Sequence, residues 1–220
     1  MERRGQHVRF GAQQATSPII RSIVQLCCTT RRARRHAYKL EQPERPLPPL
    51  FCVFADAVSR TGLWGKVVLM RHTHVDMREG IGHLAPGSCA EEVNLSPNGI
   101  EQAKRIGEAF RTHEVAVGEI LTSPYCRCTD TGTLAFGRAT PVQFLRPPGT
   151  VSEDLATLNR QSVVQEILNH HGPSNLIMIT HDLNIADLVL EDTVPMGEFF
   201  VVQPKGTDFD IIGKVQLNNR

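Results

Sequence analysis

The sequence predicts an α/β domain in which helices cover both faces of a largely parallel sheet, a three-layer α/β/α sandwich. Two observations lead to this prediction. Short apolar runs at Val67–Met70 and Asn175–Thr180 are bounded by polar residues, as is typical of strands that are buried on both faces. Helical patterns alternate with such runs along the chain, and this alternation is typical of a parallel sheet.

Local signals place the first helix after Val67–Met70. Ser96 is a suitable N-cap, Pro97 suits the first helical position, and an apolar stripe follows at helical spacing. The stripe consists of Ile100, Ala103, Ile106, Gly107 and Phe110. We assign this face to the core.

The remaining elements follow in chain order. The sequence predicts a strand over Glu119–Thr122, a helix from Tyr125 to about Phe136 that Gly137 ends, a short strand over Pro141–Leu145, and a helix from about Ser152 to about His170. After Asn175–Thr180 it predicts a short helix over Asn184–Leu190 and a terminal strand pair, Glu198–Gln203 with Phe209–Gln216.

Side chains that suit phosphate chemistry stand directly after two of the predicted strands. Arg71 and His72 follow the first apolar run, and His181 and Asp182 follow Asn175–Thr180. In open α/β sheets the reactive groups gather beyond the carboxyl ends of the strands. The two histidines can meet only if their strands are neighbours in one sheet.

A third strand end supplies a second arginine. Ser123-Pro124 is the expected start of a helix, so Arg127 falls in the first turn, where free backbone N–H groups also favour an anion. A guanidinium group holds phosphate, and an imidazole nitrogen can attack its phosphorus. The sequence therefore predicts a site where two arginines and two histidines surround one anionic group.

Four blocks of the chain resemble the histidine phosphatase superfamily, in branch 1, which includes cofactor-dependent phosphoglycerate mutases and small phosphohistidine phosphatases. The blocks are LMRHT at 69–73, LSPNGIEQAKRIGEAF at 95–110, LTSPYCRCTDTGTLAFG at 121–137 and LIMITHDLNIADL at 176–188. They cover most of Val67–Gln216, whereas nothing before about Leu63 resembles the family. The resemblance implies a phosphoglycerate mutase-like fold.

Two positions depart from the family pattern. Thr73 stands where the family usually has glycine after the Arg-His pair. Thr131-Gly132-Thr133 stands where the pattern usually reads Thr-Ala. The glycine predicts a locally weaker helix rather than a loss of activity.

The resemblance implies that His72 is the phosphorylated nucleophile, that Arg71 and Arg127 clamp the phosphate, and that a protonated His181 is a further donor. Water then cleaves the phosphohistidine. The arginines supply the charge that magnesium supplies in kinases, so we expect a phosphatase with no metal and no cofactor. The expected substrate is a phosphomonoester or phosphohistidine, on a phosphorylated small molecule or a phosphoprotein. We assign its specificity to Val75–Val93 and Phe144–Asp154.

The proton donor and the reaction class have alternatives at this stage. Asp182, Glu153 and Asp154 are all candidates for the acid that protonates the leaving group. The run His72-Thr73-His74, with His181 and Asp182, could instead begin a metal-dependent hydrolase site, although arginines are unfavourable beside a cation. A second alternative is a non-catalytic phosphate-binding module that keeps the clamps.

The first 60 residues differ in character from the rest of the chain. Residues 1–50 carry nine Arg and one Lys against three Glu, a balance of +7, in a chain whose formal net charge is +1. The basic run Arg31–Arg35 is more typical of a solvated tail than of a nucleic-acid patch, and we expect no nucleic-acid partner. We predict a basic, proline-containing extension over 1–60 and a histidine phosphatase domain over 61–220.

The compartment depends on this extension. Leu50–Ala57 is an apolar segment with an A-x-A ending, like the end of a signal peptide, but it lies too far from Met1. The extension is therefore a disordered tail, a targeting segment or the product of a misassigned start. The sequence leaves the compartment open: cytoplasmic, or exported (periplasmic) if the true start lies downstream. No apolar run approaches the roughly 20 residues of a transmembrane helix.

The cysteines of the domain allow one disulfide. Cys126 and Cys128 are two positions apart and point to different sides of a helix, so at most one of them faces Cys89. A disulfide from Cys89 to one of the two would indicate export. Buried free thiols are the expectation for an intracellular protein.

Overall fold

The computed structural model describes residues 65–76 and 88–217. Its strands are β1 (Val67–Arg71), β2 (Val117–Thr122), β3 (Thr140–Pro141), β4 (Asn175–Thr180), β5 (Glu198–Lys205) and β6 (Asp208–Gln216). Its α-helices are α3 (Pro97–Thr112), α4 (Cys126–Phe136), α5 (Glu153–Asn169) and α6 (Asp182–Val189). Three short 3-10 helices are η1 (Cys89–Glu91), η2 (Gln143–Leu145) and η3 (Pro148–Thr150).

The strands of the described residues form one six-stranded sheet in the order β3-β2-β4-β1-β5-β6. The pairs β2–β3, β2–β4 and β1–β4 are parallel. The pairs β1–β5 and β5–β6 are antiparallel, so the terminal hairpin extends the parallel part of the sheet at one edge. The predicted α/β fold with a largely parallel sheet is therefore confirmed.

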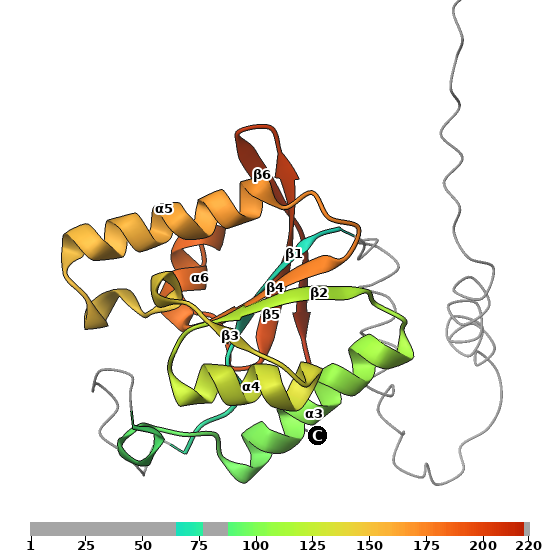
Figure 1. Ribbon diagram of the computed structural model, residues 1–220, viewed down its shortest axis with the longest axis vertical. Coiled ribbons are helices and arrows are strands. Elements are labelled where there is room, and N and C mark those ends of the chain that lie inside the picture. The colour runs from blue at the N-terminus through green and yellow to red at the C-terminus, as the bar shows by residue number, and fades with distance from the viewer. Residues whose placement is uncertain (1–64, 77–87, 218–220) are drawn as a thin grey trace, which may run out of the picture. The chain divides into compact units, whose positions relative to one another are not determined.

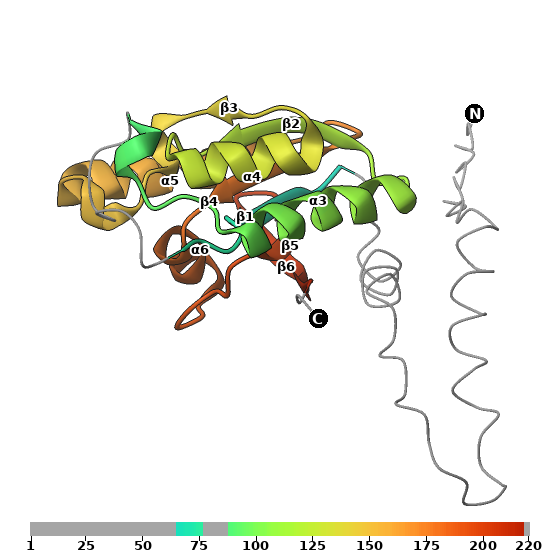
Figure 2. The same ribbon diagram turned by 90° about the horizontal axis from the view of Figure 1, so that it is seen from below.

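Helices cover both faces of the sheet. Figure 1 shows α3 and α4 together on one side of the strands and α5 and α6 together on the other, and Figure 2 shows α3 and α4 from below. Strand β1 shows how the two faces are filled. Val68 and Met70 pack into the core beneath α3 and α4, while Val67 and Leu69 pack into the core beneath α5 and α6. An apolar run without alternation arises because both faces of the strand are buried.

The structure contains the capping interactions that the sequence predicted at three helix ends. Ser96 accepts a hydrogen bond from the Gly99 N–H at the start of α3, and Ser152 accepts one from the Leu155 N–H at the start of α5. Gly137 ends α4 in the left-handed conformation, with φ of 77°. These three caps involve residues that are close in sequence, which is why they could be predicted.

Three predicted elements need correction. The strand over Pro141–Leu145 is wrong, because the chain pairs with β2 only at Thr140–Pro141 and then turns into η2. Helix α4 begins at Cys126 with Tyr125 as its N-cap, so the Ser-Pro pair precedes the helix instead of opening it. Helix α6 begins at Asp182, two residues earlier than predicted, because His181 is its N-cap.

The predicted extension over 1–60 lies outside the described residues, as do residues 77–87 of the predicted specificity segment Val75–Val93. The division into an extension and a domain therefore stays a prediction. No helix within 65–76 and 88–217 combines the length and the apolar character that crossing a membrane requires.

Candidate active site

Three neighbouring strand ends bring the predicted side chains together. Strand β4 lies between β1 and β2, with Arg71 paired to Thr180 and Thr122 paired to Ile179. His72 and His181 are the residues that directly follow β1 and β4, and their ring centroids are 5.5 Å apart. The two histidines could meet only if their strands were neighbours in one sheet. In the structure the strands are neighbours and the histidines meet.

His72 is held as a neutral imidazole with one nitrogen available. Its side chain is 5 % exposed, and its Nδ1 lies 2.9 Å from the carbonyl oxygen of Thr73. A carbonyl oxygen only accepts, so Nδ1 carries the proton and Nε2 keeps its lone pair. Burial first, and then the charges of Arg127 and Arg71, lower the pKa of His72 to about 3. A neutral, unprotonated Nε2 is what a nucleophile requires.

His181 is also neutral, in contrast to the expected protonated side chain. Its Nδ1 lies 3.2 Å from Arg127 Nη2, and a guanidinium group can only donate. Its Nε2 therefore carries the proton and donates to Ser123 Oγ at 2.8 Å. Burial first, and then His72 and the two arginines, lower the pKa of His181 well below its ordinary value.

The two arginines approach from different elements. Arg127 is buried in the first turn of α4, and its guanidinium carbon lies 4.4 Å from the ring centroid of Tyr125. Arg71 ends β1, and its Nη1 donates to the carbonyl of Val194 and to Asp182 Oδ2. Within the described residues its buried Nε has no hydrogen-bond partner. Two guanidinium groups around one space can hold a dianion.

Asp182 holds Arg71 through one of three hydrogen bonds to its carboxylate. Its Oδ2 accepts from Arg71 at 3.1 Å and from Thr193 Oγ1 at 3.1 Å, while its Oδ1 accepts from the Val194 N–H at 2.7 Å. The other two acid candidates, Glu153 and Asp154, are exposed in the first turn of α5. The geometry places Asp182 against Arg71, and the identity of the acid among Asp182, Glu153 and Asp154 stays a prediction.

Glu92 is a site-adjacent residue that the sequence did not reveal. Its Oε2 accepts from the Cys126 N–H at 2.7 Å, at the first residue of α4. The sequence predicted that free N–H groups at this helix start would favour the phosphate, but the anion that lies there is the Glu92 carboxylate. A capping contact across 34 residues leaves no local sequence signal.

A pair of threonines connects the nucleophile to the helix that carries Arg127. The Thr73 N–H and Thr73 Oγ1 both lie 3.2 Å from Thr131 Oγ1, and that hydroxyl donates to the Arg127 carbonyl at 2.7 Å. Thr73 is the residue that departs from the family's usual glycine. Its side chain therefore strengthens the contact between the end of β1 and α4.

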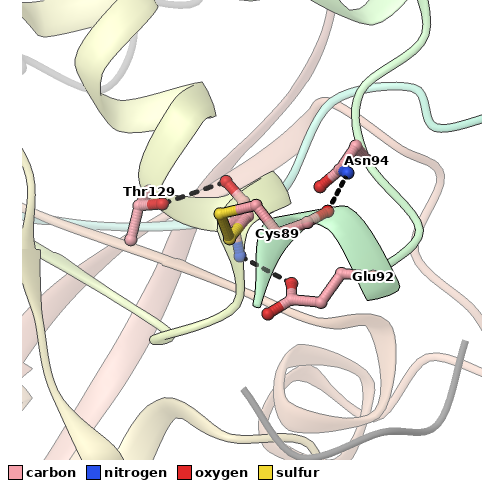
Figure 3. The surroundings of a disulfide bond; sticks show 5 residues. Cys89, Glu92, Asn94 and Thr129 are labelled. Carbon is pink, nitrogen blue, oxygen red and sulfur yellow. Dashed lines mark hydrogen bonds between the residues drawn. A yellow bond between two sulfur atoms is a disulfide. The ribbon is translucent and has the colours of Figure 1, made fainter. Parts of the chain in front are cut away.

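The cysteines of residues 88–217 form one disulfide, Cys89–Cys126, beside the start of α4 (Figure 3). The expectation of free thiols is wrong for this pair. Cys128 is free and buried, and burial raises the pKa of its thiol to about 12. The disulfide joins Cys89 to the side of α4 that Cys128 does not face, in agreement with the expected directions of the two helix positions.

The alternative metal site has no geometric support in the described part of the chain. His74 is exposed, and no group of three or more His, Cys, Asp or Glu side chains within these residues is placed to hold a metal ion. Within these residues His72 and His74 do not converge with a third such side chain.

A cavity of about 380 Å³ lies between α5 and α6. Its wall includes Arg146, Pro148, Ala156, Leu183 and Asn184. Leu183 and Asn184 directly follow His181 and Asp182, so the cavity lies beside the end of α6 that carries the site. Arg146 and Pro148 belong to Phe144–Asp154, one of the two segments to which we assigned specificity.

Comparison with known proteins gives one family match. Residues 67–147 match the model of the histidine phosphatase superfamily (branch 1). No curated protein matches the chain in sequence.

Two solved structures have a similar fold. The protein histidine phosphatase SixA complexed with tungstate has a TM-score of 0.51 at 16% identity, over 69% of this chain and 97% of that chain. A proposed α-ribazole-5′-P phosphatase from Escherichia coli K-12 has a TM-score of 0.50 at 14% identity, over 66% of this chain and 94% of that chain. At these identities the likenesses show the fold.

Proposed function

We propose that this chain, whose residues 67–147 match the model of branch 1 of the histidine phosphatase superfamily, hydrolyses phosphorylated substrates through a phosphohistidine on His72. The family match supports phosphatase activity in general. The observation that carries the finer proposal is the neutral His72 imidazole, whose Nε2 lone pair lies among Arg71, Arg127 and His181.

The first step transfers the phosphoryl group to the protein. His72 Nε2 attacks the phosphorus in line, and a nitrogen–phosphorus bond forms as the bond to the leaving group breaks. Arg71 and Arg127 bind the non-bridging oxygens, and the neutral His181, which accepts from Arg127 and donates to Ser123, holds Arg127 in place beside them. The Thr73 carbonyl accepts from Nδ1, so it stabilises the positive charge that develops on the phosphorylated ring.

The second step restores the protein. Water attacks the phosphorus, the nitrogen–phosphorus bond breaks with its electron pair returning to Nε2, and inorganic phosphate leaves. The low pKa of His72 favours this return, because a weakly basic ring nitrogen is a good leaving group. The same burial that keeps the nucleophile neutral thus assists both steps.

Asp182 is hydrogen-bonded to other groups of the protein, which favours a substrate whose leaving group does not have to be protonated by a carboxylic acid. Three hydrogen bonds hold this carboxylate against Arg71, Thr193 and Val194. The imidazole of a phosphohistidine can accept a proton on its own ring before it leaves, whereas an alkoxide must be protonated as it leaves. We therefore favour phosphohistidine over an alkyl phosphomonoester, with the rest of the substrate extending toward the cavity between α5 and α6.

The experiment measures hydrolysis of an aryl phosphate, an alkyl phosphate and a phosphohistidine peptide, with and without a strong chelator. We expect turnover that survives chelation, that vanadate blocks, and that is slowest for the alkyl phosphate. An acid-quenched reaction should lose its label and an alkali-quenched one should keep it, as a phosphohistidine does. His72→Ala should abolish both turnover and label.

Other outcomes identify the alternatives. Activity that is lost with the metal and restored by zinc or manganese would identify a metal-dependent hydrolase. Vanadate binding without turnover of any substrate would identify a phosphate-binding module. Equal rates for alkyl and aryl esters would require an acid, and Asp182→Asn and Glu153→Gln would then show which carboxylate supplies the proton.

A further inference from the structure

The segment that precedes α3 is attached twice to the first residue of α4. The Cys89–Cys126 disulfide is one attachment, and the hydrogen bond from the Cys126 N–H to Glu92 Oε2, at 2.7 Å, is the other. Figure 3 shows Cys89, Glu92 and Asn94 of this segment around the disulfide, with Asn94 donating to the Cys89 carbonyl. We call Cys89, Glu92 and Cys126 the α4 clasp.

Glu92 is an unusual residue to bury at this place. Its side chain is only 5 % exposed, and within the described residues its Oε1 has no hydrogen-bond partner. Burial of a carboxylate with one oxygen unpaired lowers the stability of the fold. Such a group in a native structure therefore calls for an explanation. Tyr125, the N-cap of α4, makes no side-chain capping bond, so Glu92 supplies the only side-chain cap that the described residues give this helix.

The clasp lies one residue from a phosphate clamp. Arg127 follows Cys126 in the first turn of α4. Its Nη2 lies 3.2 Å from His181 Nδ1. The first turn of a helix frays easily when its N–H groups lack a cap. The Glu92 carboxylate therefore acts on Arg127 through the backbone of α4.

We propose that Glu92 is a positioning residue for Arg127, and that the Cys89–Cys126 disulfide keeps Glu92 in place, so that reduction of the disulfide weakens phosphate binding. This inference rests on the proposed function. Cys89 is exposed and Cys126 is buried, so a reducing dithiol attacks the Cys89 sulfur. The first step forms a mixed disulfide at Cys89 and releases Cys126 as a thiolate.

The second thiol of the dithiol completes the exchange. It attacks the mixed disulfide, so the dithiol becomes a cyclic disulfide and Cys89 and Cys126 each gain a proton and one electron. The freed segment then regains conformational freedom, which opposes the burial of the Glu92 carboxylate. Loss of the cap moves Arg127 away from the position that binds a phosphoryl oxygen.

The test measures tungstate binding by calorimetry and aryl phosphate hydrolysis on the full chain. It compares the oxidised wild type, the wild type reduced by a dithiol and desalted under nitrogen, Cys89→Ser and Glu92→Gln. We expect each change to weaken tungstate binding by about tenfold and to lower kcat/KM by a similar factor. Glu91→Gln, a matched change on the exposed neighbour, should bind as the wild type does.

Two comparisons of combined changes distinguish a role of Glu92 in positioning Arg127 from a general loss of stability. Reduction should have less than about a twofold further effect in the Glu92→Gln protein, and Glu92→Gln should have no further effect in an Arg127→Ala background. Thermal unfolding sets an assay temperature at which every variant is folded. Additive effects in either comparison, or equal binding by Glu92→Gln and Glu91→Gln, would overturn the proposal.

The experiment also distinguishes failure of the proposed function. If the wild type binds tungstate but hydrolyses no substrate, the proposed phosphatase activity is wrong, while the binding comparisons still decide whether Glu92 positions Arg127. If the wild type binds no tungstate, both proposals are overturned. If it hydrolyses substrate and reduction changes neither binding nor kcat/KM, only the clasp proposal fails.

Discussion

At the scale of single residues, His72 illustrates how burial prepares a side chain for chemistry at a cost in stability. The side chain is almost fully buried, with two arginines and a second histidine around it. These surroundings disfavour the imidazolium form and leave a lone pair on Nε2. The unfolded chain does not impose this penalty, so the protein must be less stable wherever an ordinary histidine would take up a proton.

This difference predicts a pH-dependent stability. Between pH 6.5 and about pH 3 the unfolded chain binds a proton that native His72 does not, so stability falls as the pH falls through this window. The contribution is about 1.4 kcal/mol per pH unit. The His72→Asn protein lacks it, and its free energy of unfolding should therefore fall less than that of the wild type between pH 7 and pH 4.5, by roughly 2 to 3 kcal/mol.

Urea unfolding at the two pH values measures this difference. The exposed His74, two residues further on, provides the matched control His74→Asn, whose stability should follow the wild type. If His72→Asn lost as much stability in acid as the wild type does, the neutral state that we assign to the nucleophile would be incorrect.

At the scale of elements, the contact between α3 and α4 depends on a glycine at the interface. A Cβ added to Gly107 would lie 1.9 Å from the Ala135 carbonyl oxygen, so α3 can approach α4 only where this side chain is absent. Gly132 has a similar role on α4, because an added Cβ would lie 3.2 Å from Thr122 Cγ2 and from Ala139 Cβ. The glycine that departs from the family's Thr-Ala pattern therefore also lets α4 pack closely.

Gly107→Ala should destabilise the protein and impair the site. The added methyl group must push the two helices apart, and overpacking of this kind costs typically about 1 to 3 kcal/mol. Because α4 carries Arg127, tungstate affinity should fall as well. Gly149→Ala is the control, because nothing lies within 4 Å of its added Cβ, and it should change stability by no more than about 0.5 kcal/mol.

Denaturant unfolding and tungstate calorimetry on the two variants check this prediction. Gly107→Ala with wild-type stability would mean that α3 and α4 can separate without strain. Lost stability with unchanged tungstate affinity would mean that Arg127 keeps its place when α4 moves.

At the scale of the whole molecule, the described residues contain the complete set of layers that surrounds the site. Both apolar cores, the six-stranded sheet and the helices on its two faces lie within 65–217. The first β-strand begins at Val67, next to the predicted boundary between the extension and the domain. The sheet needs no residue from the first 60 to complete its described pairing.

A truncated chain that begins at Ser59 should therefore fold and keep full turnover. Circular dichroism, thermal unfolding and aryl phosphate hydrolysis, measured beside the full chain, check this expectation. The isolated domain should unfold in one cooperative transition, as single domains of this size usually do. An insoluble or inactive truncated protein would show that the first 60 residues complete the core, contrary to the predicted division of the chain.

The sequence alone was sufficient for features that depend on local order or on hydrophobic period. Buried strands appear as unbroken apolar runs, and Ser96, Ser152 and Gly137 mark helix ends through contacts with residues a few positions away. The placement of Arg71, His72 and His181 after strands follows from the same runs. The sheet then brings them together, because the carboxyl ends of adjacent parallel strands lie at one edge.

Tertiary structure decided the features that join distant residues. The neutral state of His181, the three hydrogen bonds of Asp182 and the Glu92 cap on α4 all depend on partners that lie 11 to 111 residues away. The choice of Cys126 as the partner of Cys89 depends in the same way on how α4 is oriented. Protonation and hydrogen bonding are set by the neighbours of a group in space, and a sequence pattern specifies those neighbours only within a few residues.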